Sequence, residues 1–177
     1  AALEQLGHGF ALAARNSVPH VAQALHLSVM AGIRTDSIAA AIGATRIVRA
    51  MPNTPALIGQ GIAGLFATPT VSGAERALVE QVLAASGELL WVNQESDAVT
   101  ALSGSGPAYV FYFIEAMIQA AGEMGLSAEQ GRRLALATFA GATALARQSP
   151  DSPAVLRERV TSKGGTTHAA ISSLELD

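Results

Sequence analysis

The sequence contains no cysteine among its 177 residues. Disulfide bonds, thiolate zinc sites and cysteine nucleophiles are therefore excluded. Aromatic residues are scarce, at 5%, and charged residues make up only 14%. The net charge of −3 gives no reason to expect nucleic acid or an acidic membrane surface as a partner. What the chain has is alanine and other apolar residues, and this composition predicts a globular protein with closely packed helices.

Targeting segments are not evident either. Residues 1–10 lack a cationic region followed by an apolar run, so no secretory signal is predicted, and the missing initiator Met indicates a processed or truncated chain. The most apolar stretch, 134–146, has about thirteen residues, whereas a bilayer span needs about twenty. We interpret it as a buried helix, and we expect a cytoplasmic protein without membrane partners.

Strand and helix patterns alternate in the first half of the chain. Short apolar runs predict strands, and amphipathic segments that begin at Thr35 and at Ser72 predict helices between them. The predicted strands are 25–30, 46–50, 61–67 and 87–92. This alternation is typical of a parallel α/β sheet, which we assign to residues 1–94.

Residues 95–177 contain no convincing strand pattern and are predicted to be entirely helical. The predicted helices are 107–124, 127–148, 153–160 and 169–176. In the first of them the polar residues Glu115, Gln119 and Glu123 form a single stripe, and the other sides are apolar. A helix that is apolar on nearly all sides must be buried on nearly all sides, so we expect a partner subunit.

The clearest motif is Gly164-Gly165-Thr166-Thr167, which leads into a predicted helix. Glycines allow a close approach of the backbone, a helix start offers unpaired amides, and the threonines add hydroxyl donors, so the combination can bind an anion. An equally open alternative is that Thr166 or Thr167 is an ordinary N-cap beside a glycine turn. Neighbouring Lys163 and His168 are interpreted as surface residues, and the sequence has no metal-ligand spacing.

Three further turns occupy positions where ligands often bind. Ser105-Gly106-Pro107 opens the long apolar helix, and Met51-Pro52-Asn53 and Ala31-Gly32 each follow a predicted strand. The carboxyl ends of parallel strands are where α/β sheets place their ligands. Each of these turns can also be purely structural.

Three segments together carry a resemblance to a known family. They are 46–56 (RIVRAMPNTPA), 103–109 (SGSGPAY) and 160–167 (VTSKGGTT). In order and spacing they resemble pyrroline-5-carboxylate reductase, which reduces 1-pyrroline-5-carboxylate to L-proline, and the likeness runs from about residue 27 to 175. The resemblance implies a partial Rossmann-type domain over 1–94 and an all-α substrate-binding and dimerisation domain over 95–177.

The resemblance also implies cofactors, partners and site residues. It implies NADPH or NADH as hydride donor, and a homodimer with a decamer of dimers as the larger assembly. The implied cofactor-binding residues are Ala31, Gly32, Met51, Pro52 and Asn53. The implied substrate-binding residues are Ser105, Gly106, Pro107, Ser162, Gly164, Gly165, Thr166 and Thr167. Thr167 is the implied catalytic residue, because its hydroxyl can serve the ring nitrogen.

The sequence departs from this family where the cofactor pyrophosphate would bind. A Gly-x-Gly-x-x-Gly turn after a first strand is absent, and Gly7-His8-Gly9 does not replace it. A non-catalytic dimerisation module of the same family is therefore an alternative. A related hydroxyacid reductase is a third interpretation, but such enzymes place a catalytic Lys on the long helix, and 107–124 has none.

Overall fold

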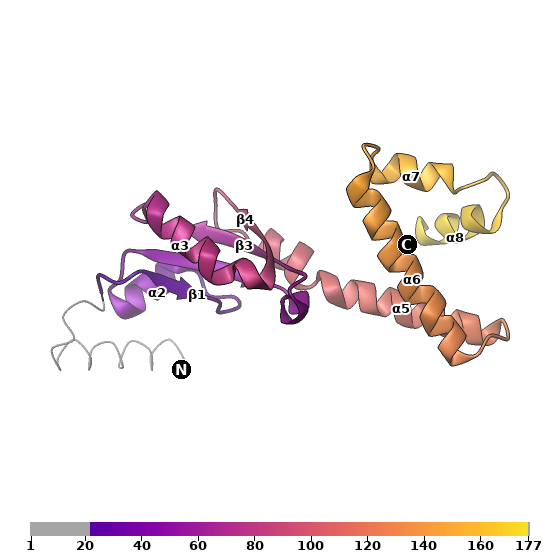
Figure 1. The fold of residues 1–177 in the computed structure, drawn as a ribbon, viewed down its shortest axis with the longest axis horizontal. Helices are drawn as coiled ribbons and strands as arrows, with labels where there is room; N and C mark the ends of the chain where they lie inside the picture. The colour runs from indigo at the N-terminus through magenta and orange to yellow at the C-terminus, as the bar shows by residue number, and fades with distance from the viewer. Residues whose placement is uncertain (1–21, 177) are drawn as a thin grey trace. The chain divides into compact units, whose positions relative to one another are not determined.

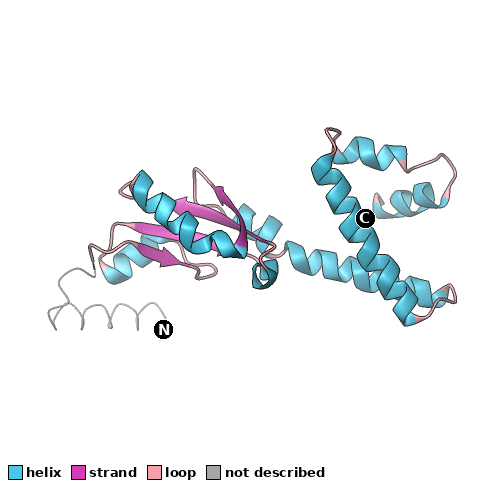
Figure 2. Ribbon diagram, in the orientation of Figure 1, coloured by secondary structure: helices cyan, strands magenta, loops and turns pink. Residues whose placement is uncertain are grey.

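The computed structural model describes residues 22–176, so the Gly7-His8-Gly9 segment lies outside the described residues. The chain divides after Phe111 into two compact units (Figure 1). All strands of the described residues belong to the first unit, and the second is helical (Figure 2). The expected α/β region followed by an all-α region is confirmed.

The first unit is built on a sheet in which, within residues 22–176, four strands lie in the order β1-β2-β3-β4. The strands are β1 (His26–Ser28), β2 (Ile47–Pro52), β3 (Gly61–Ala67) and β4 (Gly87–Trp91). Helix α2 (Thr35–Ile42) connects β1 to β2, and α3 (Gly73–Leu83) with the short η2 (Ala84–Ser86) connects β3 to β4. Both connections produce parallel pairs, as a strand, helix, strand unit should.

The expectation of a fully parallel sheet is wrong at one junction, because β2 and β3 pair antiparallel. The connecting segment 53–60 holds only a 3-10 helix, η1 (Thr54–Ile58). A parallel crossover takes about a dozen residues or more, so this short connection returns the chain in the opposite direction. Pro52 ends β2 in the register position opposite Ala63.

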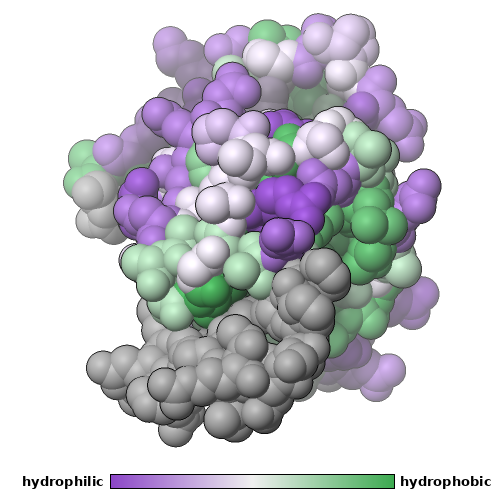
Figure 3. Space-filling view, turned by 90° about the vertical axis from the view of Figure 1, so that its left-hand side faces the viewer, coloured by the Kyte–Doolittle hydropathy of each residue, from purple (hydrophilic) through white to green (hydrophobic). Residues whose placement is uncertain are grey.

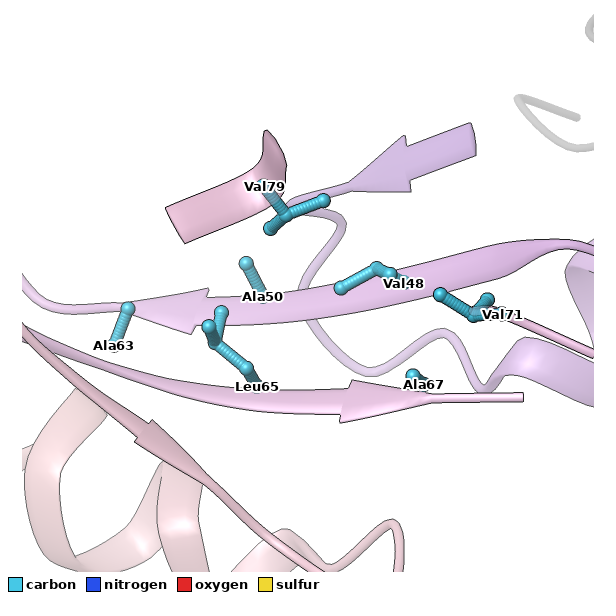
Figure 4. Close-up of a cluster of buried hydrophobic side chains, with 7 residues drawn as sticks. All are labelled: Val48, Ala50, Ala63, Leu65, Ala67, Val71 and Val79. Atoms are coloured by element: carbon cyan, nitrogen blue, oxygen red, sulfur yellow. The ribbon is translucent and has the colours of Figure 1, made fainter. Parts of the chain in front are cut away.

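Helices α2 and α3 cover opposite faces of the sheet. Val79 of α3 packs with Val48 of β2 and Leu65 of β3 (Figure 4), whereas Ile38 of α2 packs with Ile47. Successive side chains along a strand point to opposite faces, so the neighbouring residues Ile47 and Val48 belong to different clusters, one on each face of the sheet. Both strand residues are fully buried.

A compact segment follows β4 and leads into the second unit. It contains a single turn of helix, α4 (Asp97–Val99), then a π-turn, η3 (Thr100–Gly104), and then the start of α5 (Gly106–Glu123). Val99 packs directly over Gly64 of β3, where any side chain would collide with it. Glycine at position 64 therefore lets this segment lie close against the sheet.

The second unit contains the rest of α5, then α6 (Ala128–Gln148), α7 (Pro153–Arg159) and α8 (Thr166–Leu174). Ser127 begins α6 with a capping box in which its hydroxyl and the Gln130 side chain exchange hydrogen bonds with each other's backbone amides. Ala121 of α5 and Gly131 of α6 meet at a close contact between these helices. The predicted helices are thus confirmed, although the last one begins three residues earlier than predicted, at Thr166 rather than at 169.

Large apolar side chains remain exposed on the helices. They include Tyr112 (69%) and Phe113 (45%) on α5 and Leu134 (56%) on α6. The first unit also exposes some apolar residues, and Figure 3 shows green apolar groups beside purple polar ones on its visible face. In the part of the chain from residue 22 to 176, no helix has both the length and the hydrophobicity needed to cross a membrane.

Candidate functional site

The predicted cofactor residues lie where two adjacent parallel strands end. Ala31 and Gly32 follow β1, but Met51 and Pro52, which were expected after the second strand, are the last two residues of β2, and only Asn53 follows it. Ser28 of β1 pairs with Arg49 of β2, so Ala31 and Pro52 each lie three residues beyond the same register position. Both turns therefore lie at one edge of the sheet, where parallel strands end. Ala31 and Gly32 are exposed, and Gly32 has a φ of 71° with open space beside it.

Asn53 links the turn after β2 to two other segments. Its Oδ1 accepts a hydrogen bond of 3.0 Å from the Ile62 backbone N–H in β3, and its Nδ2 donates one of 3.1 Å to the Ser103 carbonyl. Asn53 stands at the N-cap position of η1, yet its side chain makes no capping bond there. The structure thus brings the Met51-Pro52-Asn53 turn together with the segment that contains Ser105, Gly106 and Pro107.

The segment before Pro107 has a tightly bonded backbone. The Ser105 N–H donates to the Thr100 carbonyl at 2.8 Å, which closes the π-turn, and the Ser103 hydroxyl donates to the Val99 carbonyl at 2.8 Å. Turns of this kind are frequent at functional sites. Sequence reasoning did not find the π-turn, because its residues carry no periodic pattern that separates it from the helices on either side.

Residues 162–165 form a β-turn directly before α8. The Gly165 N–H donates to the Ser162 carbonyl at 3.0 Å, and Gly164, the third residue, has a φ of 77°. A positive φ at this position is typical of a type II turn, which suits glycine there and tolerates Lys163 at the second position. A Cβ at position 165 would lie 2.7 Å from the Ser162 hydroxyl oxygen and 3.2 Å from the Ser162 carbonyl oxygen, so a side chain there would force Ser162 to shift.

The start of α8 differs from the N-cap alternative considered from the sequence. Gly165, not Thr166 or Thr167, occupies the N-cap, and no side chain caps the helix. The first helical bond in this turn runs from the Ala169 N–H to the Gly165 carbonyl. The amides of Thr166, Thr167 and His168 precede that bond and, as at any helix start, are available to an anion. The two threonine hydroxyls are likewise not used in capping.

An ion pair that sequence reasoning missed joins β2 to the segment after β4. Arg49 of β2 and Glu95, which follows β4, approach to 2.8 Å, and both side chains are almost fully buried. The Glu95 carboxylate also accepts hydrogen bonds from the Thr35 N–H and hydroxyl at the start of α2. A charged Arg49 inside an otherwise apolar strand was the signal available in the sequence.

The chain has clear relatives among characterised proteins. Residues 93–177 match the family described as pyrroline-5-carboxylate reductase dimerisation. The pyrroline-5-carboxylate reductase of Pseudomonas aeruginosa is 49% identical over 154 residues, which are 85% of this chain and 56% of that protein. The enzyme of Haemophilus influenzae is 45% identical over 83% of this chain and 56% of its own length. The chain therefore spans little more than half the length of these relatives.

Solved structures agree with the sequence relatives. The pyrroline-5-carboxylate reductase of Coxiella burnetii superposes with a TM-score of 0.82 at 39% identity, over 98% of this chain and 63% of that one. A Plasmodium falciparum pyrroline carboxylate reductase with NADP bound gives a TM-score of 0.82 at 32% identity, over 89% of this chain and 63% of that one.

A sheet unit of the α/β class followed by a helical unit is the fold that the chain shares with these solved structures. The chain belongs to the pyrroline-5-carboxylate reductase family.

Proposed function

We propose that the chain is the substrate-binding and dimerising part of an enzyme that reduces 1-pyrroline-5-carboxylate to L-proline with NADPH or NADH. The observation that carries this proposal is the Gly164-Gly165-Thr166-Thr167 turn at the start of α8, in a chain 49% identical to a pyrroline-5-carboxylate reductase. The activity is assigned to the cytoplasm, in keeping with the proline-forming reaction.

The turn suits a substrate that carries one carboxylate. The backbone amides at the start of α8 lie in the positive end of the helix dipole, where a carboxylate is stabilised without a basic side chain. Ser162, Gly164, Gly165 and Thr166 form the rest of this anion-binding turn in the proposal. Thr167 is half-buried, and its hydroxyl is the donor or acceptor that we assign to the ring nitrogen.

The cofactor is assigned to the turns at the edge of β1 and β2. Ala31, Gly32, Met51, Pro52 and Asn53 lie where β1 and β2 end, the position where α/β proteins bind dinucleotides, and Gly32 leaves space for close approach. When bound, the nicotinamide supplies a hydride to the carbon of the C=N bond. The Gly-x-Gly-x-x-Gly pyrophosphate turn is absent from this sequence, so the fit extends to these edge turns alone.

The protein's own contribution to this reaction is positioning and electrostatics. No nucleophile is required, because hydride addition to an imine forms no covalent bond to the enzyme. The turn before α8 orients the carboxylate, Ser105, Gly106 and Pro107 shape the substrate and nicotinamide region, and the Thr167 hydroxyl stays hydrogen-bonded to the nitrogen as its charge changes. Because the reaction needs only positioning and electrostatic stabilisation from the protein, the proposed site requires no acid–base dyad.

A non-catalytic dimerisation module is the second candidate. The exposed apolar side chains on α5 and α6, among them Tyr112 and Leu134, favour a dimer in which a second copy covers them. A hydroxyacid reductase is disfavoured, because α5 carries no Lys.

A binding titration with L-proline and NADPH, separately and together, tests these candidates, with the oligomeric mass measured in the same sample. L-proline binding to a dimer, together with NADPH oxidation in the presence of the cyclic imine, supports the reductase. A stable dimer that binds neither ligand supports the module. The mass also decides between a dimer and the decamer of dimers.

A further inference from the structure

The backbone carbonyl of Ser103 lacks the hydrogen-bond donor that the following helix would normally provide. In an α-helix this oxygen would accept from the N–H four residues later, which here belongs to Pro107. Proline has no backbone N–H. The next N–H along the chain, that of Ala108, donates instead to the Ser105 carbonyl at 2.9 Å. Pro107 therefore leaves the Ser103 carbonyl without its helical partner.

Asn53 supplies the donor that this carbonyl lacks. Its Nδ2 lies 3.1 Å from the Ser103 oxygen, while its Oδ1 accepts from the Ile62 N–H at 3.0 Å. The orientation of the amide follows from these partners, because a backbone N–H only donates and a carbonyl only accepts. Each end of the side chain is thus engaged by the protein, on β3 and on the π-turn.

We propose that Asn53 is a positioning residue whose side-chain amide replaces the N–H missing at Pro107, and so holds the 103–107 turn against the end of β2. This role differs from direct contact with a cofactor. Its consequence for ligand binding rests on the proposed function, but the coupling between positions 53 and 107 does not.

The coupling is tested by amide hydrogen exchange on the chain and three variants: Asn53→Asp, Pro107→Ala and the double substitution. Asp keeps the acceptor for Ile62 and removes the donor to Ser103. We expect Asn53→Asp to speed exchange at the Ser105 amide about tenfold or more, since it leaves the partly buried Ser103 carbonyl unpaired, which is costly. Pro107→Ala restores a helical N–H that can pair with the Ser103 carbonyl. The exchange rate of the Ser105 amide in the double variant should therefore lie within about threefold of the rate in Pro107→Ala alone, as a coupled pair requires.

Asn93→Asp is the matched control, because it makes the same chemical change at an exposed position. It should leave exchange at Ser105 unchanged. Unchanged exchange in Asn53→Asp would overturn the proposal. Faster exchange that Pro107→Ala does not relieve would also overturn it, because Asn53 would then act through Ile62 alone.

Ligand titration separates positioning from direct cofactor contact. Asn53→Asp should weaken L-proline binding several-fold and NADPH binding by a smaller factor, since the effect of its side chain passes through the turn that carries Ser105, Gly106 and Pro107. The reverse pattern would make Asn53 a cofactor ligand and overturn the proposal. If the unsubstituted chain binds neither ligand, the proposed function fails, and hydrogen exchange still decides the coupling.

Discussion

Arg49 and Glu95 form a buried ion pair in which Nη1 and Oε1 lie 2.8 Å apart and the side chains are 1% and 5% exposed. Glu95 also holds the start of α2 through the Thr35 N–H, with 3.1 Å to each carboxylate oxygen. Among the described residues, the Arg49 Nε has no hydrogen-bond partner. The positive charge of buried Arg49 is therefore balanced by the carboxylate of Glu95. Through these contacts the ion pair connects β2, the start of α2 and the segment that leads to the π-turn.

Glu95→Gln should destabilise the chain by about 3 kcal/mol, because it leaves a buried guanidinium without a counter-charge. The free energy of unfolding from urea denaturation measures this loss. Asp36→Asn is the control, since Asp36 is exposed and should cost about 0.5 kcal/mol or less. A loss below about 1 kcal/mol in Glu95→Gln would show that the pair is dispensable for stability.

Gly131→Ala should loosen the contact between α5 and α6. The added Cβ would lie 2.9 Å from the Ala121 Cβ and 3.4 Å from the Ile118 carbonyl oxygen. Overpacking of this kind costs about 1–3 kcal/mol. Gly141→Ala, on the same helix but with open space around it, should instead stabilise by about 0.5–1 kcal/mol. Thermal unfolding of the two variants gives the comparison, and equal shifts would contradict the close contact.

The pKa of Glu75 lies below its ordinary value of 4.5, first because the Ser72 backbone N–H donates to its carboxylate, then because the Ser72 hydroxyl and Arg46 also favour the charged form. A lowered pKa in the folded state stabilises the protein above the unfolded pKa, and this stability is lost as pH falls through the folded value. Glu75→Gln should therefore have a lower Tm than the parent at pH 7, and the difference should shrink as pH falls from 4.5 through the lowered pKa of the folded state. A difference that does not shrink as pH falls below 4.5 would exclude the charge as its origin.

Thr167→Ala should lower kcat/KM for the cyclic imine in an assembled reductase, because it removes the hydroxyl assigned to the ring nitrogen. The expected loss of transition-state stabilisation is about 1–3 kcal/mol. Thr167→Ser keeps the hydroxyl and should retain most of the activity. Lys163→Ala is expected to matter less, since the amides at the start of α8 remain. An unchanged kcat/KM in Thr167→Ala would remove the assigned role, and a larger loss at Lys163 would mean that the anion site is placed wrongly.

Local sequence patterns were sufficient to predict most elements of the fold. The run 61–67 predicted β3 with its observed bounds, and Ser127 predicted the start of α6, because strand periodicity and capping depend on residues close together in the chain. The antiparallel turn between β2 and β3 was not predicted. Apolar runs show that strands exist, but their direction depends on how the connection folds.

For the candidate site, the sequence predicted the residues but not their hydrogen-bond partners. The glycine-threonine motif indicated an anion site from residue types alone, yet the N-cap proved to be Gly165, because the threonines do not turn back to cap the helix. Asn53 was expected to lie near a cofactor, and the structure adds its bonds to Ile62 and Ser103, which are nine and fifty positions away in the sequence.

The sequence by itself determined the family, the order of strands and helices, and the residue types available for chemistry, since each of these is encoded in short segments. Only the tertiary structure decided that Asn53 reaches Ser103, that Arg49 is neutralised by Glu95, and that Gly64 accommodates Val99. These pairs lie far apart along the chain, and the packing of the sheet with the segment after β4 is what brings them within contact distance.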